Sequence, residues 1–144
     1  LKKFDAVILN GKSDNFKEIE NQIYSINSNI KIFKTFYKIS NIQKYNLNFK
    51  YLIFSGIGNP SDFKEILLEN EFNINKEIIF PDHYEYSLDD FEKIQNQAKT
   101  ENLKIITTEK DYMKVPDKFK KEIDFLTIDL VIQNEDKLIE LLNY

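Results

Sequence analysis

The only histidine of this 144-residue chain, His83, lies between an aspartate and a tyrosine in the stretch Pro81-Asp82-His83-Tyr84. Histidine titrates near neutral pH and is the commonest general acid or base in enzymes. A neighbouring carboxylate can orient its ring and hold a proton on it. His83 and Asp82 are therefore the predicted catalytic residues. The alternative is a structural histidine that only packs its loop against the helix that follows.

A second polar stretch, Ser55-Gly56-Ile57-Gly58-Asn59-Pro60, follows the apolar run 51–54. Glycines before a helix expose backbone amides that bind anions, and the helix dipole adds to this attraction. The spacing G-x-G-N-P is neither the dinucleotide fingerprint nor the G-x-x-x-x-G-K-[ST] P-loop. Gly56, Gly58 and Asn59 are predicted to contact phosphate. The alternative is a tight turn that uses glycine for its geometry alone.

The third stretch, Thr107-Thr108-Glu109-Lys110-Asp111, follows the apolar run 103–106. A lysine between two carboxylates can bind a phosphate or keep a nearby acid ionised, and the threonines add hydroxyl groups. The predicted phosphate-binding residues of this stretch are Thr108, Glu109, Lys110 and Asp111. The alternative is a solvated face of mixed charge.

All three stretches come directly after short apolar runs and before helical patterns, and this alternation predicts an α/β fold with a mostly parallel sheet flanked by helices. Open sheets of this kind place their chemistry at the carboxyl ends of the strands, so the three stretches are expected to form one site. A single domain is predicted over residues 1–144. Predicted strands cover residues 7–9, 30–39, 51–54, 77–80, 103–106 and 126–132.

Helix starts are marked by capping residues. Asn59 with Pro60, Ser87 with Asp90 as a capping box, and Asn134 mark three of them. Ser13 or Asp14 can cap the first helix, whose apolar face would be formed by Phe16, Ile19, Ile23 and Ile26.

Composition excludes several classes of function. The net charge is −4, there is no arginine, and no dense basic stripe exists, so nucleic acid is not an expected partner. The absence of cysteine and the single histidine exclude disulfides and multi-histidine zinc sites, and no metal ligands are predicted. No apolar run reaches 18 residues. Because the chain opens at Leu1, almost within a strand, it is expected to be part of a longer protein; a trimmed or processed start is the alternative.

The segments 54–60, 80–84 and 107–111 together resemble, in order and spacing, the C-terminal half of the tetraacyldisaccharide 4'-kinase family, the lipid A 4'-kinases of Gram-negative bacteria. The opening segment 4–11 is similar to the family sequence just upstream. The resemblance extends over nearly the whole chain, and three motifs in register make it specific.

The resemblance implies a P-loop-kinase-like C-terminal domain of a two-domain enzyme. Such an enzyme transfers the γ-phosphate of ATP, with Mg²⁺, to the 4'-hydroxyl of a tetraacyldisaccharide 1-phosphate, the lipid A precursor, at the cytoplasmic face of the inner membrane. His83 matches the family's catalytic histidine, which pairs with an aspartate of the N-terminal domain, and Asp82 matches its neighbour.

This chain has no Walker A sequence, which departs from the complete family pattern. The resemblance therefore implies that the main ATP and Mg²⁺ ligands and the membrane contact lie in an N-terminal domain outside the chain. The isolated chain is expected to be soluble and inactive, and its oligomeric state stays open. Two other interpretations are a standalone nucleotide- or phosphosugar-binding module and a small hydrolase that uses His83 with Asp82.

Overall fold

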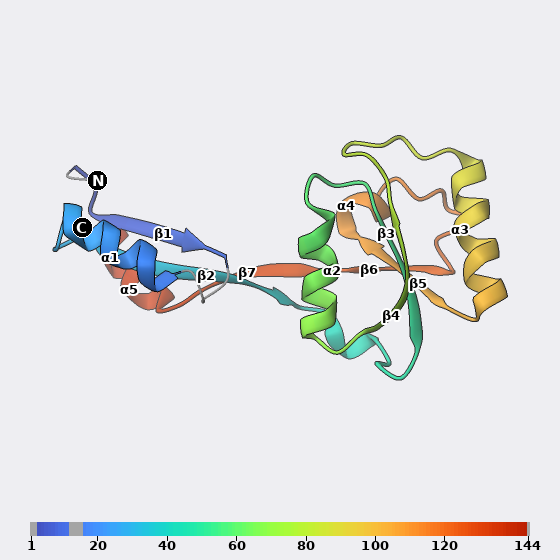
Figure 1. The fold of residues 1–144 in the computed structure, drawn as a ribbon, viewed down its shortest axis with the longest axis horizontal. Helices are drawn as coiled ribbons and strands as arrows, with labels where there is room; N and C mark the ends of the chain where they lie inside the picture. Colours follow the sequence, from blue (N-terminus) through green and yellow to red (C-terminus); the bar gives the residue numbers. More distant parts are fainter. Residues whose placement is uncertain (1–2, 12–15, 144) are drawn as a thin grey trace. The chain divides into compact units, whose positions relative to one another are not determined.

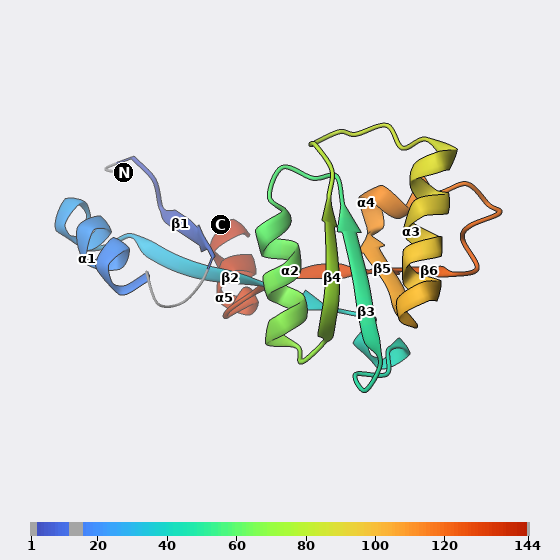
Figure 2. The same ribbon diagram turned by 45° about the vertical axis from the view of Figure 1, so that its right-hand side comes forward.

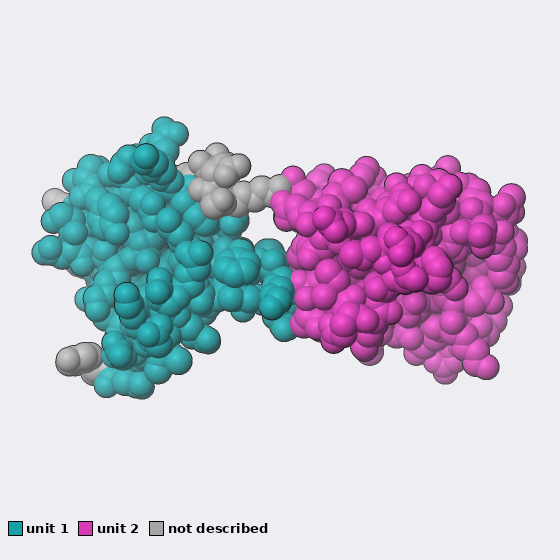
Figure 3. Space-filling view, turned by 90° about the horizontal axis from the view of Figure 1, so that it is seen from below, with its two compact units in different colours: residues 1–38, 129–144 teal, residues 39–128 magenta. Residues whose placement is uncertain are grey.

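The chain is divided by its internal contacts into two compact units, which Figure 3 colours separately. The computed structural model describes residues 3–11 and 16–143. Unit 1 comprises residues 1–38 and 129–144, and unit 2 comprises residues 39–128. The prediction of a single domain over residues 1–144 stays a prediction.

Unit 1 is built on a three-stranded sheet with the order β1-β2-β7. Its strands are β1 (Ala6–Asn10), β2 (Lys31–Ile39) and β7 (Ile128–Ile132), and β1 runs parallel to β2. Two helices accompany them, α1 (Phe16–Ile26) and α5 (Glu135–Leu142). Of the predicted apolar face of α1, Phe16 and Ile23 are buried, whereas Ile19 and Ile26 remain exposed. The predicted caps Ser13 and Asp14 lie outside the described residues.

Unit 2 contains a parallel sheet with the order β4-β3-β5-β6 (Figure 1). The strands are β3 (Lys50–Ser55), β4 (Asn73–Ile79), β5 (Lys104–Thr108) and β6 (Ile123–Leu126). Helices α2 (Pro60–Glu69) and α3 (Leu88–Glu101) lie on opposite faces of this sheet (Figure 2). The short elements η2 (Ile42–Lys44) and α4 (Glu109–Tyr112) complete the unit. The predicted α/β class with a parallel sheet flanked by helices is confirmed.

Strand β3 is buried on both faces, as its continuous apolar sequence predicts. Leu52 and Phe54 pack in the core formed with α3, whereas Tyr51 and Ile53 pack in the core formed with α2. All four side chains are at most 2% exposed. Because successive side chains of a strand point to opposite faces, one short strand joins both cores and fixes the position of the loop at its end.

Residues 126–132 do not form the single strand that their alternation predicts. They form two strands, β6 and β7, which belong to different sheets. The break falls at Thr127, whose N–H donates to the side chain of Asn41 and whose carbonyl accepts from the backbone of Ser40. Hydrogen bonds from a segment distant in the sequence therefore end the strand at Thr127, although apolar and polar residues continue to alternate beyond it.

The predicted helix starts are confirmed in position but differ in their hydrogen bonds. Ser87 and Asp90 form the reciprocal capping box of α3. Asn59 and Asn134 occupy the N-cap positions of α2 and α5, yet neither side chain makes a capping hydrogen bond. Helix α4 was not predicted, although Thr108 caps it by accepting from the backbone N–H of Asp111 at 3.1 Å.

Candidate active site

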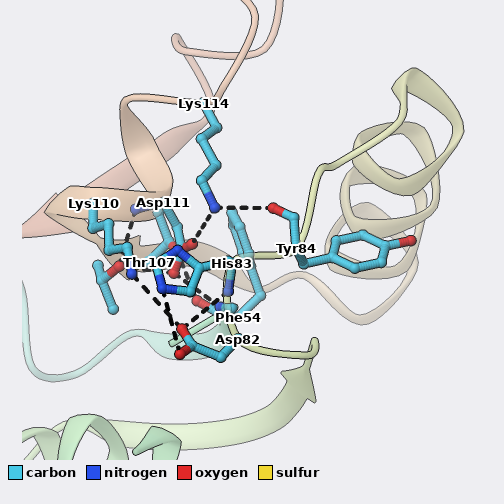
Figure 4. A network of polar contacts seen from close by, with 10 residues as sticks. Phe54, Asp82, His83, Tyr84, Thr107, Lys110, Asp111 and Lys114 are labelled. Atoms are coloured by element: carbon cyan, nitrogen blue, oxygen red, sulfur yellow. Dashed lines mark hydrogen bonds and ion pairs between the residues drawn. The ribbon is translucent and has the colours of Figure 1, made fainter. Parts of the chain in front are cut away.

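Three loops meet at the carboxyl edge of the unit 2 sheet (Figure 4). They are the glycine loop (residues 55–60), the histidine loop (residues 80–87) and the threonine turn (residues 107–111). The N–H of His83 donates to the carbonyl of Gly56 at 3.2 Å, and the N–H of Gly56 donates to Oδ2 of Asp111 at 2.9 Å. Parallel strands bring their carboxyl ends to one edge, so the predicted juxtaposition of the three stretches follows from the sheet itself.

The glycine loop lies against the histidine loop with no space for side chains. A Cβ atom on Gly56 would lie 2.8 Å from Oη of Tyr86 and 3.3 Å from the carbonyl oxygen of Pro81. A Cβ atom on Gly58 would lie 3.3 Å from Oδ2 of Asp82. Neither glycine has a positive φ. Close approach of the two loops, and not a left-handed turn, is therefore what requires glycine here.

His83 occupies a backbone conformation that side chains rarely adopt, with a φ of 58°. This left-handed conformation costs about 1–2 kcal/mol for a residue other than glycine. Its N–H donates to the carbonyl of Gly56 and also to Oδ1 of Asp82 at 2.9 Å. The side chain is 78% exposed. An imidazole this exposed does little packing, so a purely structural role explains neither its exposure nor its conformation.

Three charged or ionisable groups lie together above this loop. Oδ2 of Asp82 is 3.6 Å from Nε2 of His83, and Oδ1 of Asp82 is 3.7 Å from Nζ of Lys110. Asp82 and Lys110 are both about half exposed. Exposed ion pairs contribute at most about 1 kcal/mol to stability. The arrangement therefore matters mainly for where it places charge, beside an accessible imidazole.

The threonine turn directs its polar atoms inward. Oγ1 of Thr107 donates to the carbonyl of Phe54 at 2.7 Å, and Oγ1 of Thr108 donates to Oδ2 of Asp111 at 2.8 Å. The Asp111 side chain is 0% exposed. A carboxylate buried in this way does not face a bound phosphate, and the predicted phosphate contact of Asp111 has no support in the geometry. Glu109 and Lys110 are exposed.

Three aromatic side chains of the histidine loop, those of Phe80, Tyr84 and Tyr86, pack against one another. The rings of Tyr84 and Tyr86 lie 4.8 Å and 4.9 Å, between centroids, from that of Phe80. Tyr86 also contacts Phe54 and Phe91 of the core. Burial, followed by the negative charge of Asp111, raises the pKa of the Tyr86 phenol well above its ordinary value. The phenol is therefore neutral at physiological pH.

Sequence reasoning missed Lys114, whose Nζ donates to the carbonyl of Tyr84 at 2.9 Å. It also missed the supporting roles of Tyr84 and Tyr86. The recurrence of aromatic residues around the histidine, at Phe80, Tyr84 and Tyr86, was a usable signal for the two tyrosines. No sequence signal marked Lys114.

Within residues 3–11 and 16–143, no group of three or more histidine, aspartate or glutamate side chains could hold a metal ion. Over the same residues, no helix combines the length and the apolar character that crossing a bilayer requires.

Comparison with known proteins gives a consistent result. The family model described as tetraacyldisaccharide-1-P 4'-kinase matches residues 1–144. The chain is 41% identical over 138 residues to a tetraacyldisaccharide 4'-kinase of Pelagibacter ubique. This alignment covers 96% of this chain and 44% of the relative. It is 43% identical over 90 residues to the enzyme of the same name from Rickettsia akari, covering 62% of this chain and 27% of the relative.

A solved structure shares the fold. The crystal structure of the "apo" form of LpxK from Aquifex aeolicus in complex with ATP aligns with a TM-score of 0.58 and 22% identity. The alignment covers 99% of this chain and 42% of that one. The chain thus spans less than half the length of these relatives.

Proposed function

This chain belongs to the tetraacyldisaccharide 4'-kinase family, and from that premise we propose that it forms the C-terminal portion of a lipid A 4'-kinase. The complete protein transfers the γ-phosphate of ATP to the 4'-hydroxyl of a tetraacyldisaccharide 1-phosphate. The family name supplies the acceptor, and the ATP complex of the structural relative supports the donor. The reaction takes place at the cytoplasmic face of the inner membrane, where the lipid acceptor is presented.

The observation that carries this proposal is the exposed imidazole of His83 beside Asp82. The 4'-hydroxyl loses its proton as its oxygen attacks the γ-phosphorus, and the bond from phosphorus to the bridging oxygen of ADP breaks. His83 accepts that proton, and Asp82 stabilises the imidazolium that results. The separation of 3.6 Å exceeds hydrogen-bond range, so Asp82 acts through its charge. We place the hydrogen-bond partner of the ring, an aspartate, in the remainder of the protein.

Some of the predicted phosphate-binding groups already have a hydrogen-bond partner within the chain, which leaves fewer groups to contact a phosphate. The N–H of Gly56 already donates to Asp111, and the Thr108 hydroxyl does the same. The groups left to meet a phosphate are the backbone amides around Gly58 and Asn59, at the start of the 10-residue helix α2, and the ammonium group of Lys110. Asp62 in the first turn of α2 opposes an anion, and Glu109 beside Lys110 does too. Lys110 is therefore the main phosphate contact that we assign to this chain.

ATP and Mg²⁺ are bound mainly by the part of the relatives that this chain does not cover. The chain contains no Walker A sequence, the loop that holds the phosphates in P-loop kinases. Phosphoryl transfer depends on positioning and on charge stabilisation by such groups. We place the membrane contact in the same portion of the protein, outside residues 1–144. This portion supplies the acceptor side of the active site.

The test is a transfer assay on the full-length protein. The protein, ATP, Mg²⁺ and synthetic tetraacyldisaccharide 1-phosphate are incubated, and the 4'-phosphorylated lipid is measured by mass spectrometry. We expect Mg²⁺-dependent formation of the 1,4'-bisphosphate. Binding of ATP or of the lipid without transfer would instead indicate a binding module, and release of phosphate without a phosphorylated lipid would indicate a hydrolase. Either result would refute the proposed function.

A further inference from the structure

The carboxylate of Asp111 lies directly beneath the histidine loop and is fully buried. Its Oδ2 atom accepts from the N–H of Gly56 at 2.9 Å and from the hydroxyl of Thr108 at 2.8 Å. Its Oδ1 atom is also buried and accepts no hydrogen bond from the described residues. The nearest charge to that atom is Nζ of Lys114, at 3.7 Å. A carboxylate buried in this way needs a partner for its charge, and Lys114 is the cation that lies within ion-pair distance of it.

Lys114 extends this arrangement to the residue that follows His83. Its Nζ atom donates to the carbonyl of Tyr84 at 2.9 Å and lies 5.4 Å from the ring centre of Tyr86. Figure 4 shows the ammonium group between Asp111 and the Tyr84 carbonyl, while the Tyr84 ring points away from it. Lys114 therefore contacts both the backbone of the histidine loop and the ring of Tyr86 within it.

Two connections run from the same carboxylate to His83. The first passes through Gly56, which donates to Asp111 and accepts from the N–H of His83. The second passes through Lys114 to the carbonyl of Tyr84. Together they hold the backbone on both sides of the His83 side chain. This is where the backbone adopts the unfavourable φ of 58°.

We infer that Asp111 and Lys114 form a clamp that positions His83 for phosphoryl transfer. Neither residue touches the substrate, so both are positioning residues and not catalytic ones. The role of the clamp in transfer depends on the proposed function, but its structural effect does not. An ion pair of this kind is a poor source of stability, because burying the charges costs as much as their attraction returns. A displacement of about 1 Å at a reacting group can lower a rate about 100-fold, which is what the clamp prevents.

The structural part of the test uses the chain 1–144 and amide hydrogen exchange measured by NMR. The variants are Lys114→Met, which keeps an apolar stem, and Asp111→Asn. The matched control is Lys118→Met, because Lys118 also pairs with a carboxylate, Glu92, and also lies over a ring, that of Phe119. We expect exchange at the amides of Gly56 and His83 to rise about 10- to 100-fold in both clamp variants and to stay within twofold in the control. Unchanged exchange in the clamp variants would overturn the inference.

The functional part uses the full-length protein and separates kcat from KM. Lys114→Met is expected to lower kcat about 10- to 100-fold, with the KM for ATP and the melting temperature close to those of the unmodified protein. Faster exchange with an unchanged kcat would overturn the positioning role. Loss of the folded state in both clamp variants would also overturn it, because the pair would then be structural. An unmodified protein without transfer activity would refute the proposed function, and the exchange measurement would still decide whether the clamp exists.

Discussion

Gly56 lies so close to the histidine loop that one added methyl group is expected to disturb it. In Gly56→Ala the new Cβ atom would lie 2.8 Å from Oη of Tyr86, a distance that side chains in folded proteins essentially never show. Because the φ of Gly56 is not positive, alanine brings no backbone strain. It instead stabilises by about 0.4–1 kcal/mol through the unfolded chain. Overpacking of a well-packed site costs about 1–3 kcal/mol. The net loss is therefore about 1–2 kcal/mol.

The same geometry predicts that the loss depends on one hydroxyl group. Oη of Tyr86 is buried and has no hydrogen-bond partner among the described residues, so Tyr86→Phe alone should change stability by less than about 0.5 kcal/mol. In the Tyr86→Phe background the contact with the Gly56 methyl group is removed. Gly56→Ala should then cost about 1 kcal/mol less, which is the coupling energy of the double-mutant cycle.

The assay is urea and thermal unfolding of the four proteins of the cycle, followed by circular dichroism. A loss of 1–2 kcal/mol corresponds to a decrease in Tm of about 3–7 °C for a chain of this length. Gly58→Ala is the matched control, since its Cβ would lie 3.3 Å from the end of the exposed, movable Asp82 side chain. It should cost less than about 0.5 kcal/mol. Additive effects of Gly56→Ala and Tyr86→Phe would show that the contact with the Tyr86 hydroxyl does not cause the loss.

Two further predictions concern the capping box and the isolated chain. Hydrogen bonds from Ser87 lower the pKa of Asp90 below its ordinary value of 3.8, so their stabilisation is fully present above about pH 4 and is lost as the pH falls through the lowered pKa. Ser87→Ala should cost about 1 kcal/mol at pH 7 and less at pH 2–3, and equal losses at both pH values in urea unfolding would contradict this. The purified chain 1–144 should bind ATP weakly in calorimetry and transfer no phosphate, because phosphoryl transfer needs a P-loop and bound Mg²⁺. Mg²⁺-dependent phosphorylation of the lipid by this chain, or micromolar affinity for ATP, would be the opposite outcome.

The meeting of the three loops could be predicted because it follows from short-range patterns and from sheet geometry. The apolar runs before Gly56, His83 and Lys110 each indicate a strand, and parallel strands place their carboxyl ends at one edge. The Ser87–Asp90 capping box is local too, since both partners lie within one turn. Features of this kind depend on a few residues that are close together in the sequence, so they can be predicted from it.

The break between β6 and β7 could not be predicted in this way. It is caused by Asn41, whose side chain accepts from Thr127, 86 residues later in the sequence. The alternation of residues 126–132 is compatible with one strand, and nothing within that segment shows that its halves belong to different sheets. The division into two compact units falls close to this break, between residues 128 and 129.

The sequence identified most residues of the candidate site but did not show what each of them does. The charged pattern of residues 109–111 does not show which side chain points inward, and the structure buries Asp111 while it exposes Lys110. The contact of Lys114 with Tyr84 joins residues 30 positions apart. A charge pattern alone therefore assigns the same role to a surface contact and to a buried positioning group.

The turnover of the full-length protein with His83→Asn tests the catalytic role of His83 most directly. Asparagine tolerates the left-handed backbone of residue 83 but is not a general base, so the loop should remain in place while proton transfer is lost. Glu85→Ala is the matched control, because Glu85 is an exposed residue of the same loop. We expect kcat for lipid phosphorylation to fall about 10²- to 10⁴-fold in His83→Asn, with little change in Tm, and to be nearly unchanged in Glu85→Ala. A folded His83→Asn protein with normal kcat would show that His83 is not the general base.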